Sequence, residues 1–451
     1  MKQVSVTLST YTADVSGVCS ALYELGGMVV IHDPSGCNST YNTHDEPRWY
    51  DMDSLVFISG LSQMDAIMGN DDKFINDIVR AAKELKPRFI ALVRTPIPLM
   101  TGTDFEGISR VIEKQTGIPV FYFPTSGMHT YVSGAGMAME TVARELVLST
   151  SINVSDTHSA KDKFESLIEK ISEQPVQSQK QCLKSESAKK IIENAESKTR
   201  ACLKNAFCNT KLKINILGAT PLDFSVNSTL NSIKEFLSQH FEIISTFAMG
   251  SSIEDIQKAG EADVNLVISS VGFPAAKVLE ERFATPYVIG TPVKGFAGII
   301  AEKLIDAAWT KESQKAYFSV SSKKEKECTE NIETHMETID KAEAGNDIYI
   351  IGEAVISQSL KAALALKHEM NPTVICPLET EPEYIGENVL LLSSEEEIKE
   401  AIAEAKTVIA DPIYKTICSE KTNFIALPHE AFSGRIYRKE IPDLMNNYLI
   451  R

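Results

Sequence analysis

Positive charge is scarce in this sequence of 451 residues. It has 45 lysines and arginines against 61 aspartates and glutamates, a formal net charge of −16. This balance is the opposite of the basic footprint of nucleic-acid-binding proteins, so we expect no nucleic-acid partner. Long apolar runs are also missing: no window approaches the roughly 20 apolar residues of a membrane-spanning helix, and the N-terminus lacks the apolar core of a secretory signal. We therefore expect a cytoplasmic protein with no membrane partner and reduced cysteines.

Nucleotide-binding motifs are absent as well. The sequence contains no GxxxxGK[S/T] P-loop, and Gly134-Ala135-Gly136 lacks the third glycine of a dinucleotide fingerprint and follows no clear strand. The turns Gly218-Ala219-Thr220 and Gly352-Glu353-Ala354 are typical of ordinary strand-to-helix connections. We assign no nucleotide site to any of them.

What the sequence does contain is a repeated α/β pattern. Hydrophobic residues make up 43% and charged residues 24%, as in soluble globular proteins, and the length corresponds to about three domains. Three segments show β-branched runs, turns and amphipathic helices, which predicts an α/β fold of three doubly wound, parallel-sheet, Rossmann-like domains around a central cleft. The predicted domains are residues 1–150, 212–311 and 347–451. The polar segments 151–211 and 312–346 are predicted to connect them.

Two cysteines stand out among the eight in the chain. Cys19 is placed in the first turn of a predicted helix, where the helix dipole favours a thiolate, and Cys37 follows the turn Pro34-Ser35-Gly36. Two thiolates cannot complete a cuboidal iron–sulfur cluster, which typically takes four, but a symmetric dimer would supply two plus two. The alternative is that both are small buried core residues, since free cysteine is among the most buried residue types.

The same stretch resembles the nitrogenase component 1 superfamily. The segment Cys19 to His32-Asp33-Pro34-Ser35-Gly36-Cys37 is similar to the family's first cysteine and later His-Gly-Pro-x-Gly-Cys. Two further blocks are similar to family motifs, namely Ala66 to Phe74 and Thr95-Pro96 with Gly102-Thr103-Asp104. The three α/β segments fit the family's three-domain subunit, so the resemblance implies a nitrogenase component 1-like fold.

Several metal-ligand positions of the family are occupied by other residues in this sequence, which limits the clusters that the resemblance implies. The family's third cluster cysteine is Pro96 here, so an eight-iron cluster bound by six cysteines is not expected. An approximate alignment places Ser269 or Ser270 and the loop from Phe432 to Tyr437 where nitrogenase has the two ligands of its catalytic metallocluster. Met137 stands where a further histidine is expected. We therefore expect no reduction of dinitrogen.

The resemblance implies a nitrogenase-like oxidoreductase component of an oxygen-sensitive electron-transfer system. A [4Fe-4S] cluster would bridge two subunits, with Cys19 and Cys37 as metal ligands and the backbone near Gly36 hydrogen-bonded to its sulfur. The partners implied are a second copy or a related sister subunit, and a separate ATP-hydrolysing iron–sulfur reductase. Substrate would bind in the inter-domain cleft, with cofactor-binding or wall residues at Ser269, Ser270, Gly272 and Phe273. His429 and Arg435 are weaker candidates for the same cleft.

Two other interpretations remain open. The chain is alternatively a non-catalytic scaffold for the assembly of a metallocluster or tetrapyrrole, or a cluster-free binding protein in which Cys19 and Cys37 are core residues. Arg48 and Trp49 are candidates for an interface anchor, because arginine and tryptophan are enriched in interface hot spots. The sequence does not identify a substrate or any general acid or base.

Overall fold

The structure is a computed structural model that describes residues 6–34, 46–148, 211–226, 229–317 and 347–448. The described residues apart from Lys211 belong to one compact unit of the chain. The predicted connector 151–211, apart from Lys211, and most of the predicted connector 312–346 lie outside the described residues, as do Gly36 and Cys37. Within the described part, no helix is both long enough and apolar enough to span a bilayer.

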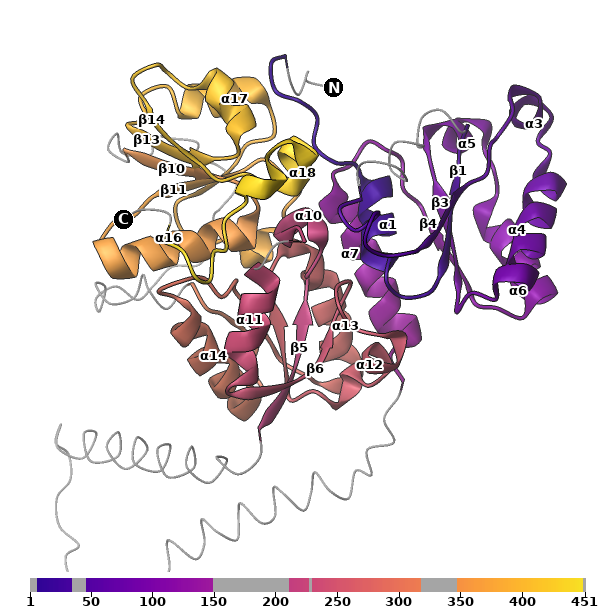
Figure 1. Ribbon diagram of the computed structural model, residues 1–451, viewed down its shortest axis with the longest axis horizontal. Coiled ribbons are helices and arrows are strands. Elements are labelled where there is room, and N and C mark those ends of the chain that lie inside the picture. Colours follow the sequence, from indigo (N-terminus) through magenta and orange to yellow (C-terminus); the bar gives the residue numbers. More distant parts are fainter. Residues whose placement is uncertain (1–5, 35–45, 149–210, 227–228, 318–346, 449–451) are drawn as a thin grey trace, which may run out of the picture. The chain divides into compact units, whose positions relative to one another are not determined.

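Three parallel sheets make up the described part of the chain (Figure 1). The first has the strand order β2-β1-β3-β4, and every pair is parallel. Its elements are α1 (Asp14–Leu22), β1 (Met28–His32), β2 (Leu55–Ile58), α3 (Gln63–Met68), α4 (Asp71–Leu85), β3 (Ile90–Arg94), α5 (Pro96–Thr101), α6 (Phe105–Thr116), β4 (Val120–Phe123), α7 (Tyr131–Thr141) and the π-helical η2 (Val142–Leu146).

The second sheet has the order β6-β5-β7-β8-β9, and its strand pairs are parallel too. Its elements are β5 (Leu212–Leu217), α10 (Pro221–Phe224), α11 (Thr229–Ser238), β6 (Phe241–Thr246), α12 (Ile253–Gln257), η4 (Ala259–Glu261), β7 (Val264–Val267), η5 (Ser270–Gly272), α13 (Phe273–Phe283), β8 (Tyr287–Ile289), α14 (Ala297–Thr310) and β9 (Gln314–Lys315).

The third sheet has the order β12-β11-β10-β13-β14, again parallel throughout. Its elements are β10 (Ile348–Ile351), α16 (Ala354–His368), β11 (Thr373–Cys376), η6 (Pro382–Tyr384), β12 (Val389–Leu391), α17 (Glu395–Ala401), β13 (Thr407–Ala410), η7 (Pro412–Ile417), β14 (Asn423–Ala426), α18 (Glu430–Ser433) and η8 (Gly434–Glu440). The predicted α/β class with three doubly wound sheets is confirmed, whereas the exact domain boundaries stay a prediction.

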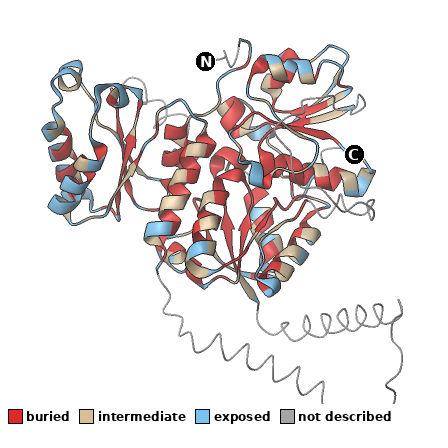
Figure 2. Cartoon of the chain, turned by 180° about the vertical axis from the view of Figure 1, so that it is seen from behind, coloured by how far each residue is buried: buried red, intermediate tan, exposed pale blue. Residues whose placement is uncertain are grey.

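Both faces of the sheets are covered, which explains why their central strands are almost continuously apolar. In β1, Val29 and Ile31 belong to the larger core, while the alternate residues Met28 and Val30 pack with α4 and α6. Figure 2 shows buried residues along the strands and exposed residues on the outer helix faces. Burial on both faces leaves the carboxyl ends of the strands as the places where polar side chains gather.

Helices α1 and α7 approach each other closely, and glycine makes this possible. A Cβ atom on Gly17 would collide with the backbone of Tyr131, and one on Gly134 would collide with the backbone of Asp14. Asp14 also begins α1 and accepts hydrogen bonds from the backbone N–H groups of Ser126 (2.9 Å) and Gly127 (2.9 Å). Gly134, one of the two glycines in the incomplete dinucleotide motif, therefore serves the packing of α7 against α1.

Arg48 connects the first and second sheets. Its guanidinium pairs with Glu46 (2.6 Å) and Glu24 (2.8 Å), and it donates to the carbonyls of Ser20 (2.7 Å) and Ala248 (2.9 Å). Burial lowers the pKa of this group, but the two carboxylates outweigh burial and raise it. The expectation that Arg48 anchors an external interface is wrong, because the side chain is buried and used within the chain.

The N-terminal segment crosses from α1 to the third sheet. The backbone N–H groups of Val6, Thr7 and Leu8 all donate to Oε2 of Glu395, at 2.7, 2.7 and 2.9 Å. Burial raises the pKa of Glu395, but these backbone donors dominate and bring it down to about 2. Thr12 continues the contact by donating from its backbone N–H (2.9 Å) and its hydroxyl (3.1 Å) to the carbonyl of Ala431.

His32, at the end of β1, is predicted to make stability depend on pH. Its ring is buried and stacks on Phe74, with ring centroids 3.9 Å apart, and burial lowers its pKa from 6.5 to about 4. The unfolded chain therefore takes up a proton near pH 6.5 that the folded chain refuses until about pH 4, so stability is lost as pH falls through this window. We expect a loss of about 2 kcal/mol between pH 7 and pH 5.

The measurement is the urea unfolding midpoint of the full-length protein at pH 7 and at pH 5, in wild type and in His32→Gln. Carboxylate titrations are shared by the two proteins, so the difference in pH dependence isolates His32. Equal pH dependence in the two proteins would contradict the prediction.

Candidate functional site

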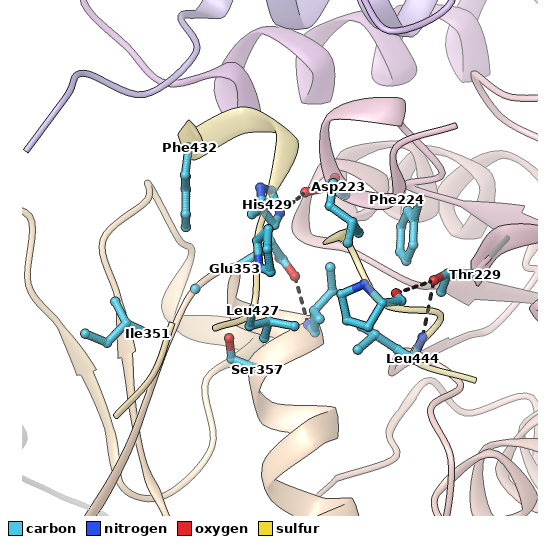
Figure 3. A pocket seen from close by; sticks show the side chains of 15 residues that line it. Asp223, Phe224, Thr229, Ile351, Glu353, Ser357, Leu427, His429, Phe432 and Leu444 are labelled. Atoms are coloured by element: carbon cyan, nitrogen blue, oxygen red, sulfur yellow. Dashed lines mark hydrogen bonds and ion pairs between the residues drawn. The ribbon is translucent and has the colours of Figure 1, made fainter. Parts of the chain in front are cut away.

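A small cavity of about 30 Å³ lies where the carboxyl ends of strands from the second and third sheets meet (Figure 3). Doubly wound folds place their ligands at this edge of the sheet. Apolar side chains form most of the wall, and two carboxylates and one imidazole interrupt it. The lining residues are Asp223, Phe224, Thr229, Ile351, Gly352, Glu353, Ile356, Ser357, Leu427, Pro428, His429, Phe432, Ile441, Pro442 and Leu444.

Asp223 is held on the short helix α10, directly after β5. Thr220 caps this helix by accepting the backbone N–H of Asp223 (3.3 Å), and Pro221 occupies the first helical position. The carboxylate is buried and accepts three hydroxyl donors, from Tyr131, from Thr220 (2.9 Å) and from Ser269 (2.9 Å). Because a buried charge is costly unless it is hydrogen-bonded, these donors are what allows Asp223 to line the cavity.

Tyr131, the first residue of α7, reaches Asp223 from the elements of the first sheet. Its side chain is fully buried, and its pKa lies well above the ordinary value because of burial and the nearby charges of Asp223 and Glu353. The hydroxyl therefore keeps its proton and acts as a donor to Oδ1 of Asp223. This hydrogen bond connects α7, which belongs to the first sheet, with the turn after β5 in the second sheet.

Glu353 joins the second and third sheets in the same region. It follows β10 and caps α16 by accepting the backbone N–H of Ile356 at Oε2 (2.8 Å). Its other oxygen accepts the backbone N–H (2.9 Å) and the hydroxyl of Ser270. Burial raises the pKa of Glu353, and the charge of Asp223 raises it further.

His429 follows β14 and supplies the imidazole of the cavity. Its Nδ1 accepts the backbone N–H of Ala431 (3.3 Å), its own backbone N–H donates to Asp411 (2.7 Å), and its ring stacks on Phe432 with centroids 4.6 Å apart. Nε2 lies 3.5 Å from Oδ1 of Asp223, and Figure 3 shows these two side chains directed at each other. The expectation that His429 lines the cleft is confirmed for this cavity.

The predicted wall residues lie one layer behind the cavity. Ser269 and Ser270 are buried and donate to Asp223 and Glu353. A Cβ atom on Gly272 would collide with the backbone of Leu217, and Phe273 is buried at the start of α13. The two serines position lining groups, and a direct role of the four residues, or of Gly36, in cofactor binding stays a prediction.

The structure corrects the environment predicted for Cys19. The helix α1 begins at Asp14, so Cys19 lies in its second turn and not in its first. Its side chain is fully buried, and burial together with the Glu46 carboxylate raises the pKa of the thiol. The sequence argument for a stabilised thiolate at this position is therefore wrong.

An iron–sulfur cluster needs donor groups that the described residues do not bring together. Among them, no group of three or more histidine, cysteine, aspartate or glutamate side chains is arranged to hold a metal ion. Cys19 is one buried thiol, and the segment carrying Cys37 lies outside the described residues. The described residues alone do not fit a cluster site.

Sequence reasoning missed Asp223 and Glu353 as site residues. Both belong to turns that the sequence pattern presents as ordinary strand-to-helix connections, around Gly218 and Gly352. The available signal was an acidic residue shortly after a buried parallel strand, at the edge where α/β folds bind ligands. Neither turn alone indicates a site. They form one only because the second and third sheets bring Asp223 and Glu353 to the same cavity.

Comparison with solved structures places the fold in a known class. Two nitrogenase structures are similar along nearly the whole chain: "Nitrogenase Cp1 at pH 6.5", with a TM-score of 0.59 and 13% identity over 98% of this chain and 91% of that one, and "Nitrogenase Cp1 at pH 5", with a TM-score of 0.53 and 12% identity over 97% and 86%. At this identity the likeness concerns the fold.

Sequence comparison gives the family. Residues 16–412 match the family described as nitrogenase component 1 type oxidoreductases, so the chain belongs to that family. This confirms the resemblance found in the cysteine segment.

Curated relatives match over shorter stretches. A light-independent protochlorophyllide reductase subunit of Nostoc punctiforme is 33% identical over 110 residues, 24% of this chain and 20% of the relative. The corresponding polypeptide of Chlorobium phaeovibrioides is 34% identical over 82 residues, 18% and 16% of the two chains. The matched stretches therefore span a fifth or less of these relatives.

The donors around Asp223 lead to a stability prediction. Tyr131→Phe removes one of three hydroxyl donors from a buried carboxylate, which we expect to cost about 1–3 kcal/mol. The measurement is the urea unfolding midpoint near pH 7. Tyr122→Phe is the matched control, because Tyr122 is partly exposed on the first sheet and has no hydrogen bond to Asp223. An equal loss in the two variants would contradict a special role for the Tyr131 hydroxyl.

Proposed function

We propose that the chain is the catalytic component of a nitrogenase-like oxidoreductase that reduces a substrate at the cavity between the second and third sheets. The observation that carries this proposal is the family match over residues 16–412. The cavity supports the location, because Asp223, Glu353 and His429 converge there at the carboxyl ends of parallel strands. The substrate itself is left unassigned.

The proposal includes a [4Fe-4S] cluster that receives low-potential electrons from a separate ATP-hydrolysing iron–sulfur reductase. Cys19 and Cys37 of each of two subunits would hold it. The support is the resemblance of the Cys19–Cys37 segment to the family's cluster cysteines, and the two curated relatives are named as subunits of larger enzymes. The second subunit is a copy of this chain or a related sister subunit.

A second candidate is a cluster-free binding protein of the same fold. The specific observation that favours it is the complete burial of Cys19, whose raised pKa is typical of a core thiol and not of a metal-binding thiolate. A scaffold for the assembly of a metallocluster or tetrapyrrole is the third. The catalytic component and a metallocluster scaffold differ from the cluster-free binding protein in iron content.

The test is the iron and acid-labile sulfide content of protein purified without oxygen and reconstituted, together with its electronic spectrum. We expect about four irons per dimer in wild type, since one cuboidal cluster contains four, and loss of iron in both Cys19→Ala and Cys37→Ala. Cys418→Ala is the matched control, because this partly exposed cysteine lies after η7, beside the third sheet.

Each outcome separates the candidates. Iron that is lost in the two variants and retained in the control would support the bridging cluster, and electron transfer from a reductase would then distinguish catalyst from scaffold. Iron-free wild type after reconstitution, alone and with a sister subunit, would overturn the cluster and leave the binding protein.

A further inference from the structure

The cavity between the second and third sheets is very small. A volume of about 30 Å³ has room for water and not for a substrate group. A site of this size can serve the proposed function only if part of its wall moves away. One of the elements that carry the lining residues must therefore be able to move.

Most of the wall is fixed by hydrogen bonds between elements. Asp223 and Glu353 each accept three of them. On another side of the cavity, the hydroxyl of Thr229 donates to the carbonyl of Pro442 (3.1 Å) and accepts the backbone N–H of Leu444 (3.3 Å). Moving any of these residues would leave buried polar groups without partners, which is costly. These parts of the wall are therefore poor candidates for an opening.

Phe432 of α18 is a lining residue held by packing alone. Its ring lines the cavity, stacks on His429 and is buried. The ring of Tyr11 packs on it as well, with centroids 4.8 Å apart, and the Tyr11 hydroxyl is hydrogen-bonded to the hydroxyl of the buried Tyr414. Because Tyr11 is partly exposed and Phe432 is not, Tyr11 covers Phe432 from the outside.

Tyr11 belongs to an N-terminal strap, which we define as residues 6–12. At its outer end, three successive backbone N–H groups of residues 6–8 donate to the single oxygen Oε2 of Glu395. At its inner end the chain is anchored, because Ala13 forms an antiparallel bridge with Thr130 and Asp14 begins α1. Ser9 and Thr10, between the two ends, are exposed. The strap can therefore leave the third sheet while the chain stays fixed at Ala13.

We propose that the N-terminal strap is a latch over the cavity. When Glu395 releases residues 6–8 and Tyr11 leaves Phe432, the Phe432 ring can turn into the vacated space and open the cavity to solvent. The backbone of α18 stays in place, because the His429 N–H (2.7 Å) and the Ser433 hydroxyl (2.8 Å) bind it to Asp411. The inference rests on the proposed function only in taking this cavity as the substrate site.

The closed latch is the favoured state, and opening it is far less costly than unfolding. Opening breaks the bonds of residues 6–8 to one carboxylate, the ring contact of Tyr11 with Phe432, and the bonds from Thr12 to the carbonyl of Ala431. The released backbone groups regain hydrogen bonds to water, so the net cost of each broken bond is small. Segments near a chain end with few buried apolar contacts open in this local way. A minor open population is therefore expected without loss of the fold.

The test measures how fast a thiol placed in the cavity reacts. Ser357→Cys introduces a thiol at a buried lining position. Pulses of methyl methanethiosulfonate on the full-length protein, purified without oxygen, give its reaction rate by peptide mass spectrometry. Tyr11→Ala and Glu395→Ala, each combined with Ser357→Cys, undo one end of the latch. Glu396→Ala is the matched control, because it removes an exposed acidic residue from the same first turn of α17.

We expect the introduced thiol to react about tenfold faster in each latch variant, and at an unchanged rate in the control. The buried thiols of Cys19 and Cys376 do not line the cavity and should stay unreactive throughout, which shows that the fold is intact. Equal rates for the introduced thiol in all these proteins would overturn the proposal. Faster reaction of Cys19 and Cys376 in both latch variants would overturn it too, because the whole fold would then be loosened.

A second reporter keeps the test open if Ser357→Cys does not fold. Ile351→Cys places the thiol at another buried lining position, at the end of β10. No iron, reductase or substrate is added in either assay. Absence of a cluster would thus overturn the proposed function and leave the latch standing, whereas rates that ignore the strap would overturn the latch alone.

Discussion

The buried carboxylate of Asp223 is the constraint on which the arrangement of the sheets around the cavity depends. Its hydroxyl donors come from α7, from its own turn and from the turn after β7, and the imidazole of His429 lies against it from the third sheet. A charge removed from water is tolerated only when such donors are all in place. Displacing any one of these elements would leave the buried Asp223 carboxylate with fewer hydrogen bonds and so destabilise the folded protein. A single side chain thus links segments from all three sheets.

The strands and helices follow from local patterns, which is why they could be predicted. The helix from Asp71 to Leu85 has apolar residues at helical spacing and ends shortly before Pro87, both of which can be read from the sequence. The site could not be read in the same way, because its deciding contacts are remote in sequence: Ser270 and Glu353 are 83 residues apart, and Tyr131 and Asp223 are 92 apart. The sequence offers His429 as a candidate for the cleft because it lies in the third predicted domain, whereas Asp223 and Glu353 stand in turns that look ordinary.

Packing, and not the position along the helix, decides the environment of Cys19. The helix-dipole argument needs the thiol in the first turn and near water, but α1 begins five residues earlier at Asp14 and is pressed against α7. The family resemblance therefore implies that Cys19 is a metal ligand, whereas its burial and raised pKa are typical of a core thiol. A cluster at Cys19 requires that a partner subunit or the segment around Cys37 change the surroundings of the thiol, and a core role requires nothing further.

The N-terminal contact with Glu395 has a consequence for the order in which the chain can fold. During synthesis the first residues leave the ribosome long before α17 exists, and roughly 390 residues separate the two sides of this contact. The first sheet can pair its strands without them, since β1 to β4 are contiguous in the chain. Residues 6–8 must therefore wait, unpaired, until the last sheet has been translated, which makes their docking one of the final events of biogenesis.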